Sequence, residues 1–413
     1  AAALFSPFLA LWTVGGLETP ILASLATLFT SRLVVISQRG SAKGYDFPWL
    51  GALAGLMFLT RYDSALVTVP PLIAILTIER RRPALWAGAT LGILLAASWL
   101  VFAELYYGDV FPTSYYVKFV LGTRPRIDSL STTLNFPLLS GLILPLLIRP
   151  RVKVANQPAL SKAILLGAAV SLSLFLFYAL RTSGEHMMFG FRLFVPYLLP
   201  ISLMIATNLK LSNLFFPVAF TSWQATMIAV VSMVGINPSL LTHLPAFDRA
   251  YVEYQFITPA TYGRFIDMLH MGAEAIKADW KATGRTDQPL IYLRTGGTGY
   301  WLPQFYVYET LISYRKSCGE PLVQMINASN YVQQLGISVT GTLVENIARD
   351  RPDIDPDAKL LFEAPLDWMG PTTTGYLFGA TPTPLSLGTS INDDCFVGEA
   401  GSAPKQGTPT EKD

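Results

Sequence analysis

Apolar residues occur in long runs along the first 236 positions of the chain, and most charged residues fall between these runs. The runs cover residues 1–14, 17–31, 48–60, 64–78, 84–103, 135–148, 163–180, 193–207 and 213–236. A helix needs about 20 apolar residues to cross a bilayer, so 84–103 and 213–236 are predicted to span it. Shorter runs such as 48–60 must tilt, end part-way or pack within a bundle. Because backbone groups in lipid need internal hydrogen bonds, the pattern predicts a multi-pass α-helical membrane bundle over residues 1–240.

The pattern changes beyond the last run. Residues 258–283 have the spacing of an amphipathic helix, and 290–293 and 359–363 have the composition of short strands. We therefore predict a C-terminal α/β or α+β domain over residues 245–396. A disordered polar tail is expected over 397–413.

Composition and charge support this division. Of the 413 residues, 51% are hydrophobic and 14% are charged, whereas soluble domains carry roughly a quarter charged residues. This excludes a disordered or disulfide-scaffold protein and argues against a purely soluble enzyme. Residues 1–244 hold 17 Lys and Arg against 8 Asp and Glu, and residues 245–413 hold 13 against 20. The net charge of +2 is therefore the sum of +9 in the membrane half and −7 in the other half.

The connections between the apolar runs differ in charge. One alternate set holds 11 Lys and Arg and two acids, Asp46 and Glu79, and the other holds six basic and six acidic residues. Cytoplasmic loops are enriched in Lys and Arg, so the first set is predicted to face the cytoplasm. The second set, which comprises 15–18, 61–63, 104–134 and 181–192, then lies outside together with the C-terminal domain.

The outer connections carry most of the unusual side chains. These are Glu18, Asp63, Tyr107, Asp109, Tyr115, Lys118, Glu185, His186 and Arg192. Each has a structural explanation as a helix-start acid, as part of an interfacial tyrosine belt or as a cation that reaches the headgroups. Ionisable groups at a membrane boundary are costly unless they are paired or used. Their recurrence at one depth therefore predicts a polar site on the outer face.

The residue types at this predicted site suit transfer of a group from a lipid phosphate to an alcohol. Lys118, His186 and Arg192 are charge-assisted donors for an anionic headgroup. The carboxylates of the same segments, Asp109 among them, can accept the proton of a hydroxyl group.

Four motifs follow one another in these segments. They are Gly-Leu-Glu at 16–18, Arg-x-Asp at 61–63, Tyr-Tyr-Gly-x-x-x-Pro at 106–112 with Lys118 after it, and Gly-Glu-x-Met at 184–187 with Arg192 after it. Over about residues 5–200 their order resembles membrane glycosyltransferases of the GT-C superfamily. The chain is most similar to the arabinofuranosyltransferases that cap actinobacterial cell-wall arabinan and to related bacterial proteins.

The resemblance implies an enzyme that moves a pentofuranose or hexose from a polyprenyl-phosphate donor to a hydroxyl of an extracytoplasmic glycan or glycolipid, with inversion. It implies a multi-pass protein of the bacterial inner (plasma) membrane, with an extracytoplasmic C-terminal domain. The principal catalytic acid of such enzymes belongs to an outer loop after the first span, and no such loop precedes Glu18. We expect that acid upstream of Ala1, because an apolar run is already under way at the first residue.

The resemblance also assigns roles to the outer residues. Three of them are supporting carboxylates: Glu18, Asp63 and Glu185. The others bind the donor phosphate and the substrates: Lys118, His186, Arg192, Tyr107, Asp109 and Tyr115.

The two cysteines, Cys318 and Cys395, both belong to the C-terminal domain. On an oxidising outer face a single disulfide is the simplest interpretation, and two unpaired thiols are the alternative. The sequence has no zinc-ligand spacing. The sequence does not decide whether a divalent metal, Mg or Mn, is a cofactor. The expected partners are the lipid-linked donor, the acceptor and membrane lipid, and no nucleic acid is expected.

Two other functions are compatible with the same residues. The first is a transporter or flippase of a lipid-linked saccharide, although transporters place ionisable groups near the bilayer midplane and often contain internal repeats. The second is a non-catalytic membrane scaffold, for which removal of the outer charges would be harmless.

Overall fold

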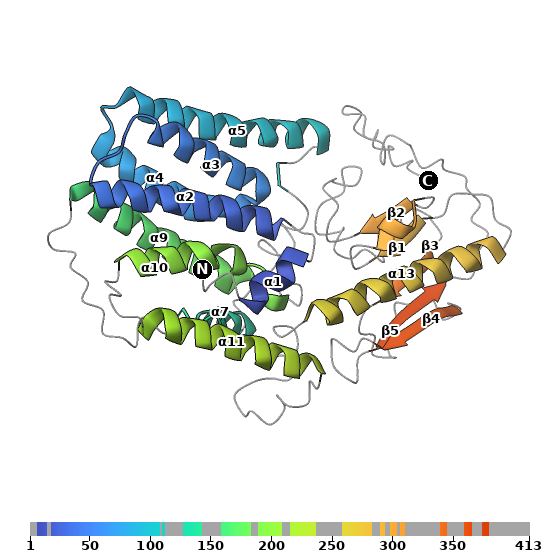
Figure 1. The fold of residues 1–413 in the computed structure, drawn as a ribbon. Coiled ribbons are helices and arrows are strands. Elements are labelled where there is room, and N and C mark those ends of the chain that lie inside the picture. Colours follow the sequence, from blue (N-terminus) through green and yellow to red (C-terminus); the bar gives the residue numbers. More distant parts are fainter. Residues whose placement is uncertain are drawn as a thin grey trace, which may run out of the picture. The chain divides into compact units, whose positions relative to one another are not determined.

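The computed structural model contains helices over the first two thirds of the chain and strands after them (Figure 1). It describes residues 6–14, 18–107, 110–111, 127–142, 158–182, 189–208, 215–236, 258–282, 290–293, 298–303, 306–309, 339–344, 359–365 and 374–379. The chain divides into two compact units. The first unit comprises residues 1–99 and 122–262, and the second comprises 100–121 and 263–413.

The first unit is built from helices. They are α1 (Pro7–Val14), α2 (Thr19–Arg39), α3 (Asp46–Thr60), α4 (Ala65–Glu79), most of α5 (Pro83–Tyr107), α7 (Ile127–Leu139), α9 (Ala159–Thr182), α10 (Leu198–Asn208) and α11 (Phe215–Ile236), with the short 3-10 helices η2 (Tyr62–Ser64), η4 (Phe189–Phe191) and η5 (Val195–Tyr197). Among the described residues, four helices are long and apolar enough to cross a membrane: Thr19–Arg39, Tyr62–Glu79, Pro83–Tyr106 and Ala159–Leu180. The prediction of a mostly helical, membrane-type architecture is confirmed at this level.

The helices begin and end differently from the apolar runs in two places. α2 continues past the run 17–31 to Arg39, and Arg32 within it forms an ion pair with Asp46 at the start of α3. α7 begins at Ile127, eight residues before the run that predicted it. A charged residue therefore ends an apolar run without ending the helix.

Helix α2 packs against several other elements of the first unit, namely α3, α9, α10 and η5. Its buried apolar residues Leu22, Ala26, Phe29, Leu33 and Ile36 recur every three or four positions and form one stripe. This packing holds the two ends of α2 in place, and a cluster of charged residues lies at each end.

The backbones of α3 and α5 touch through four glycines. A Cβ on Gly51 would lie 1.8 Å from the carbonyl oxygen of Gly88, and one on Gly92 would lie 2.8 Å from that of Gly51. Gly51 and Gly55, like Gly88 and Gly92, are separated by three residues. This is the spacing of small residues that allows close helix contact in membranes.

Two consecutive prolines interrupt the hydrogen bonds within α4. Pro71 has no N–H to donate to the carbonyl oxygen of Val67. The hydroxyl of Ser171 on α9 donates to that oxygen instead, at 2.9 Å. A side chain of a neighbouring helix thus satisfies a backbone group that a proline has left without its partner, as membrane helices often require.

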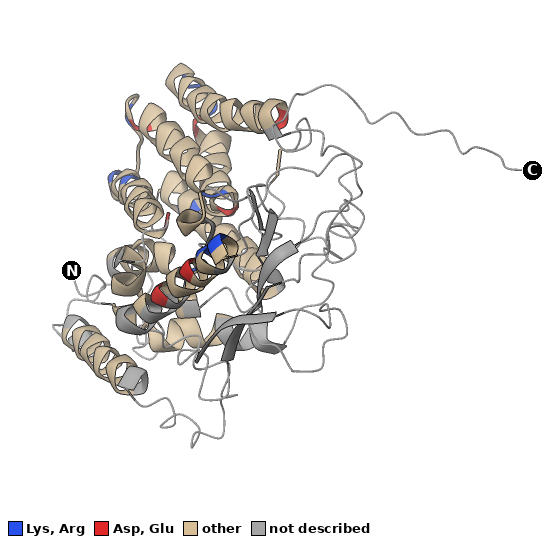
Figure 2. Ribbon diagram, turned by 90° about the vertical axis from the view of Figure 1, so that its right-hand side faces the viewer, with Lys and Arg blue, Asp and Glu red and all other residues tan. Residues whose placement is uncertain are grey.

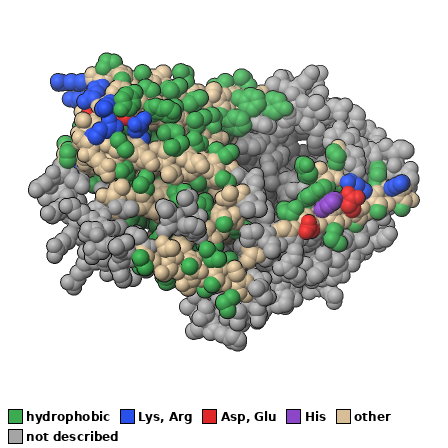
Figure 3. All heavy atoms as spheres, viewed as in Figure 1, with side chains coloured by type: hydrophobic (Ala, Val, Ile, Leu, Met, Phe, Trp, Pro, Cys, Tyr) green, Lys and Arg blue, Asp and Glu red, His purple; other side chains and the backbone are tan. Residues whose placement is uncertain are grey.

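The outward surface of α5 is apolar. Ile93 is 66% exposed and Leu94 is 61% exposed, and the body of α5 carries few charged residues (Figure 2). Exposed apolar side chains cover α5 in the space-filling view as well (Figure 3). A contiguous surface of this kind marks contact with lipid or with another protein.

The second unit contains most of α13 (Pro259–Ala282), the 3-10 helix η7 (Thr298–Trp301) and a five-stranded mixed sheet. The strands are β1 (Leu290–Leu293), β2 (Tyr306–Glu309), β3 (Val339–Val344), β4 (Lys359–Pro365) and β5 (Thr374–Gly379). Their order is β2-β1-β3-β5-β4. β1 pairs in parallel with β2 and β3, whereas β5 is antiparallel to β3 and β4. The helix and the two strands predicted in this part of the chain correspond to α13, β1 and β4.

Candidate functional site

An ion pair joins the start of α2 to the segment after η4. Nη2 of Arg192 lies 2.9 Å from Oε1 and 3.1 Å from Oε2 of Glu18. Glu18 occupies the N-cap position of α2, but its side chain makes no capping hydrogen bond. Both side chains are partly accessible, at 30% for Arg192 and 28% for Glu18. Among the described residues, none accepts a hydrogen bond from the other guanidinium nitrogens of Arg192.

The backbone before Arg192 has an unusual conformation. Gly190 and Phe191 both have positive φ angles, of 57° and 55°. Phe191 is fully buried, and its ring meets that of Phe8 edge-on at 4.9 Å. A non-glycine residue in the left-handed region costs about 1–3 kcal/mol and persists only where its surroundings fix it. The buried ring of Phe191 supplies that constraint, and the turn directs Arg192 toward Glu18.

Trp12 of α1 is part of the same arrangement. Its indole Nε1 donates to the carbonyl oxygen of Gly190 at 2.9 Å. The guanidinium carbon of Arg192 lies 5.5 Å from the centre of its ring, which is cation–π distance. The indole is almost completely buried. One tryptophan therefore holds both the turn and the cation that follows it.

A second ion pair lies at the break between α3 and α4. Arg61 has an extended backbone and ends α3. Its Nε donates to Oδ1 of Asp63 at 3.0 Å, and its Nη2 donates to Oδ2. This two-point contact fits the fork of the guanidinium group to the carboxylate. The side chains are 14% and 6% exposed, so this pair is better shielded from solvent than the first.

The two pairs act on each other electrostatically. Burial disfavours the charged form of Glu18, but Arg192, a hydrogen bond from its own backbone and the positive charge of Arg61 outweigh this effect and lower the pKa of the Glu18 carboxyl below 4.5. Glu18 is therefore ionised at neutral pH, and its attraction to Arg192 is lost only when acid protonates it below that value. Glu18, Arg61, Asp63 and Arg192 are called the two-arginine site below.

Three buried hydroxyl groups belong to this part of the fold. Thr19 directly follows Glu18, Ser64 directly follows Asp63, and Tyr197 of η5 is electrostatically coupled to Arg61. Among the described residues, none of these three hydroxyl oxygens has a hydrogen-bond partner. Buried polar groups are normally satisfied, so these three hydroxyls are exceptions among the described residues.

The structure brings together three of the residues predicted from the sequence, namely Glu18, Asp63 and Arg192. Tyr107 is the last residue of α5, and its side chain is not described. The remaining candidates lie outside the described residues: Asp109, Tyr115, Lys118, Glu185, His186, Cys318 and Cys395.

The sequence reasoning did not select Arg61, Trp12 or Tyr197 as site residues. Arg61 had a local signal, because an arginine two positions before an acid at a helix break can pair with it. Trp12 and Tyr197 had none, since both resemble ordinary apolar positions of a helix. Among the described residues, no group of three or more His, Cys, Asp or Glu side chains is arranged to hold a metal.

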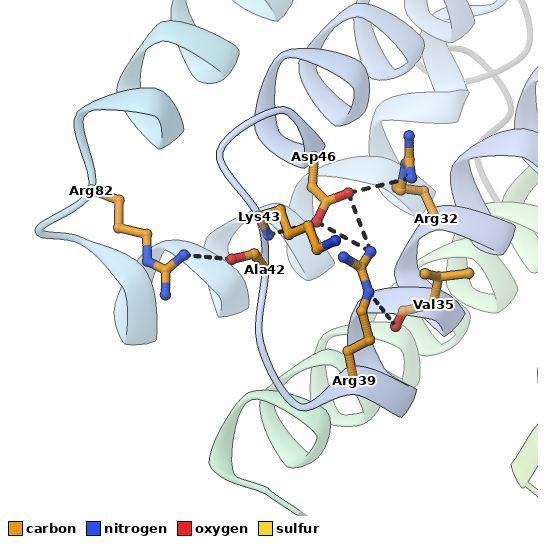
Figure 4. A network of polar contacts seen from close by, with 7 residues as sticks. All are labelled: Arg32, Val35, Arg39, Ala42, Lys43, Asp46 and Arg82. Carbon is orange, nitrogen blue, oxygen red and sulfur yellow. Dashed lines mark hydrogen bonds and ion pairs between the residues drawn. The ribbon is translucent and has the colours of Figure 1, made fainter.

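A separate charged network lies at the other end of α2 (Figure 4). Asp46 is completely buried, accepts a 2.7 Å hydrogen bond from the backbone N–H of Lys43 and pairs with Arg32 and Arg39 at 3.4 and 3.3 Å. Arg82 donates to the carbonyl oxygen of Ala42 in the same loop. Because α2 has 21 residues, about 30 Å of helix separates this network from the two-arginine site.

No family model, no curated protein and no solved structure matches this chain.

Proposed function

We propose that this chain is an integral membrane glycosyltransferase of the GT-C type. It transfers a pentofuranose or hexose from a polyprenyl-phosphate donor to a hydroxyl of an extracytoplasmic glycan or glycolipid. The observation that carries the proposal is the two-arginine site, because it gathers two guanidinium groups and two carboxylates at one end of a lipid-compatible helical unit. We expect the phosphate of a lipid-linked donor to lie at this end of the unit, with its lipid chain along the helices.

The proposed reaction makes one bond and breaks one. The acceptor hydroxyl oxygen attacks the anomeric carbon of the sugar from the face opposite the phosphate, which inverts that carbon. The bond between this carbon and the phosphate oxygen breaks, and polyprenyl phosphate leaves with the bonding electron pair. The hydroxyl proton passes to a base, for which a carboxylate is the fitting group.

Each residue of the two-arginine site has a part in this proposal. Arg192 is partly accessible and offers to the phosphate the guanidinium nitrogens that no described residue binds, where it would stabilise the charge that develops as the bond breaks. Trp12 and Glu18 hold the guanidinium in position. Arg61 is fixed by Asp63 and adds positive potential from a buried position.

The position of the charges favours an enzyme over a transporter. Transporter sites lie near the bilayer midplane, at interrupted helices. Glu18 precedes α2, a helix of 21 residues, and the network of Asp46 lies at the opposite end of that helix, so Glu18 lies at one end of a helix of spanning length and away from its middle.

The test is sugar transfer by the full-length protein carrying Arg192→Ala. We expect transfer from the polyprenyl-phosphate sugar to fall by roughly 100-fold or more, the effect of losing a donor that stabilises developing charge. Lys118→Ala, in the predicted donor-binding set, is expected to act in the same direction. Lys277→Ala is the matched control, because it breaks the exposed ion pair with Glu274 on α13 and should leave transfer unchanged.

The readout is label transferred from the lipid donor by membranes that contain equal amounts of inserted protein. Full transfer by both the Arg192→Ala and the Lys118→Ala proteins would contradict the donor-binding assignment. Absence of transfer by the unmodified protein with every pentose and hexose donor would contradict the proposal that the chain is a glycosyltransferase.

A further inference from the structure

The end of the first unit opposite the two-arginine site is basic, and its acids are already paired. Asp46 pairs with Arg32 and Arg39, and Glu79 pairs with Arg82. Three nearby cations, Lys43, Arg80 and Arg81, have no acidic partner among the described residues. All three are exposed. Lys43, Arg80 and Arg81 are called the basic patch below.

The two loops that carry the basic patch are fixed to each other. Arg82 follows Arg81 and donates to the carbonyl oxygen of Ala42, the residue before Lys43. The indole Nε1 of Trp86 donates to the carbonyl oxygen of Arg80 at 3.0 Å. The buried carboxylate of Asp46 also accepts from the backbone of Lys43. The cations therefore extend from a rigid frame, which lowers the entropy lost when they bind a common partner.

Three large aromatic side chains lie close in sequence to the residues of the basic patch. Tyr45, Trp49 and Trp86 are 51%, 57% and 53% exposed. Nζ of Lys43 lies 5.8 Å from the centre of the Tyr45 ring. Exposed Trp and Tyr beside Lys and Arg are typical of the depth at which a bilayer changes from hydrocarbon to headgroups. In Figure 3 the blue side chains at this end lie directly beside exposed hydrophobic ones.

We propose that the basic patch binds anionic phospholipid headgroups of the leaflet that it faces. The guanidinium and ammonium groups match the charge of the headgroup phosphate, and basic clusters beside membrane helices attract anionic lipid. The helix that precedes Arg80 and Arg81, α4, also exposes apolar residues, such as Ile78, which is 47% exposed. A lipid satisfies both surfaces, since its headgroup meets the cations while its chains lie along the helices. A soluble anion would satisfy the cations alone.

The test compares two lipids on the full chain in detergent micelles. The protein is titrated with phosphatidylglycerol or with phosphatidylcholine, and the bound lipid is counted by native mass spectrometry. The test variant combines Lys43→Gln, Arg80→Gln and Arg81→Gln. The matched control combines Lys43→Arg, Arg80→Lys and Arg81→Lys, which keeps every charge.

We expect the unmodified protein and the control to prefer phosphatidylglycerol. The glutamine variant should lose this preference by on the order of 100-fold, since each surface Lys or Arg contributes about 1 kcal/mol to binding an anionic surface. The preference of the unmodified protein should weaken as salt is raised. Equal thermal unfolding midpoints for the two variants would show that the loss does not reflect unfolding.

Three results would overturn the proposal. The first is an unchanged preference in the glutamine variant, and the second is equal binding of the two lipids by the unmodified protein. The third is displacement of phosphatidylglycerol by inorganic phosphate at equal concentration, which would assign the basic patch to a soluble anion.

Discussion

Arg192 is held by contacts with residues far away in the sequence. Its partner Glu18 is 174 positions earlier, and Trp12 binds Gly190 across 178 positions. The turn that orients Arg192 depends on two left-handed residues, of which only Gly190 adopts that conformation at no steric cost. Gly190 should therefore be as important for the site as the charged residues themselves.

We predict that Gly190→Ala weakens both stability and sugar transfer. An added Cβ would meet Cδ2 of Leu11 at 2.5 Å and Nε1 of Trp12 at 3.2 Å, and the left-handed backbone alone costs a non-glycine residue about 1–2 kcal/mol. The free energy of unfolding in detergent should fall by at least about that amount. Sugar transfer should fall too, because Trp12 and Arg192 would move from the positions in which they contact each other. Gly263→Ala is the control, since a Cβ there meets nothing within 4 Å. Equal stability of the two variants would contradict the role assigned to this turn.

The sequence predicted three of the four residues of the two-arginine site but not which residues form ion pairs. Arg192, Glu18 and Asp63 stand out as charges beside apolar runs, which is a local property. The pair of Arg192 with Glu18 depends on how α2 packs against the segment after η4, which one sequence does not show. The pair of Arg61 with Asp63 is local, because Arg61 directly precedes η2 and Asp63 lies within it.

At the scale of elements, the apolar runs located the helices but said little about their neighbours. The runs at 48–60 and 84–103 became α3 and α5, close to their expected bounds. A signal for their contact was present in the spacing of Gly51 and Gly55 and of Gly88 and Gly92. Similarly, Ser171 of α9 donates to the carbonyl oxygen of Val67, for which Pro71 has no N–H. The sequence shows locally that this carbonyl lacks its helix partner, but it does not show that Ser171 supplies the donor.

We predict that Gly51→Ala separates α3 from α5. Its Cβ would lie 1.8 Å from the carbonyl oxygen of Gly88, a backbone atom that cannot rotate away. Overpacking of this kind costs about 1–3 kcal/mol, which should appear as a lower unfolding midpoint in a detergent titration. The matched control is Gly44→Ala, where the nearest atom is the Cβ of Ala84 at 3.9 Å. A Gly51→Ala protein as stable as the Gly44→Ala protein would show that these helices do not pack through their glycines.

At the scale of the whole molecule, the charges of the first unit separate by position. The connections that are rich in Lys and Arg contain two acids, Asp46 and Glu79, and each pairs with arginine near the same end of α2. Glu18, at the other end, pairs with Arg192. The sequence predicted this separation from alternate connections, and it follows from helices that run the length of the unit. The sequence does not predict the strand order of the second unit, because β1 pairs with β3 and β3 pairs with β5 across long stretches of chain.

The separation predicts how the first unit sits in a membrane. Because Lys and Arg concentrate on the cytoplasmic side, the end with Asp46 should face the cytoplasm and the two-arginine site should face outward. Single cysteines test this in a protein that carries Cys318→Ser and Cys395→Ser. Thr13→Cys lies beside Trp12 and Ser41→Cys lies in the loop between α2 and α3, and both positions are exposed. In intact cells a membrane-impermeant maleimide should label Thr13→Cys and reach Ser41→Cys only after permeabilisation. The reverse pattern would place Arg192 and Glu18 in the cytoplasm, where they could not act on an extracytoplasmic acceptor.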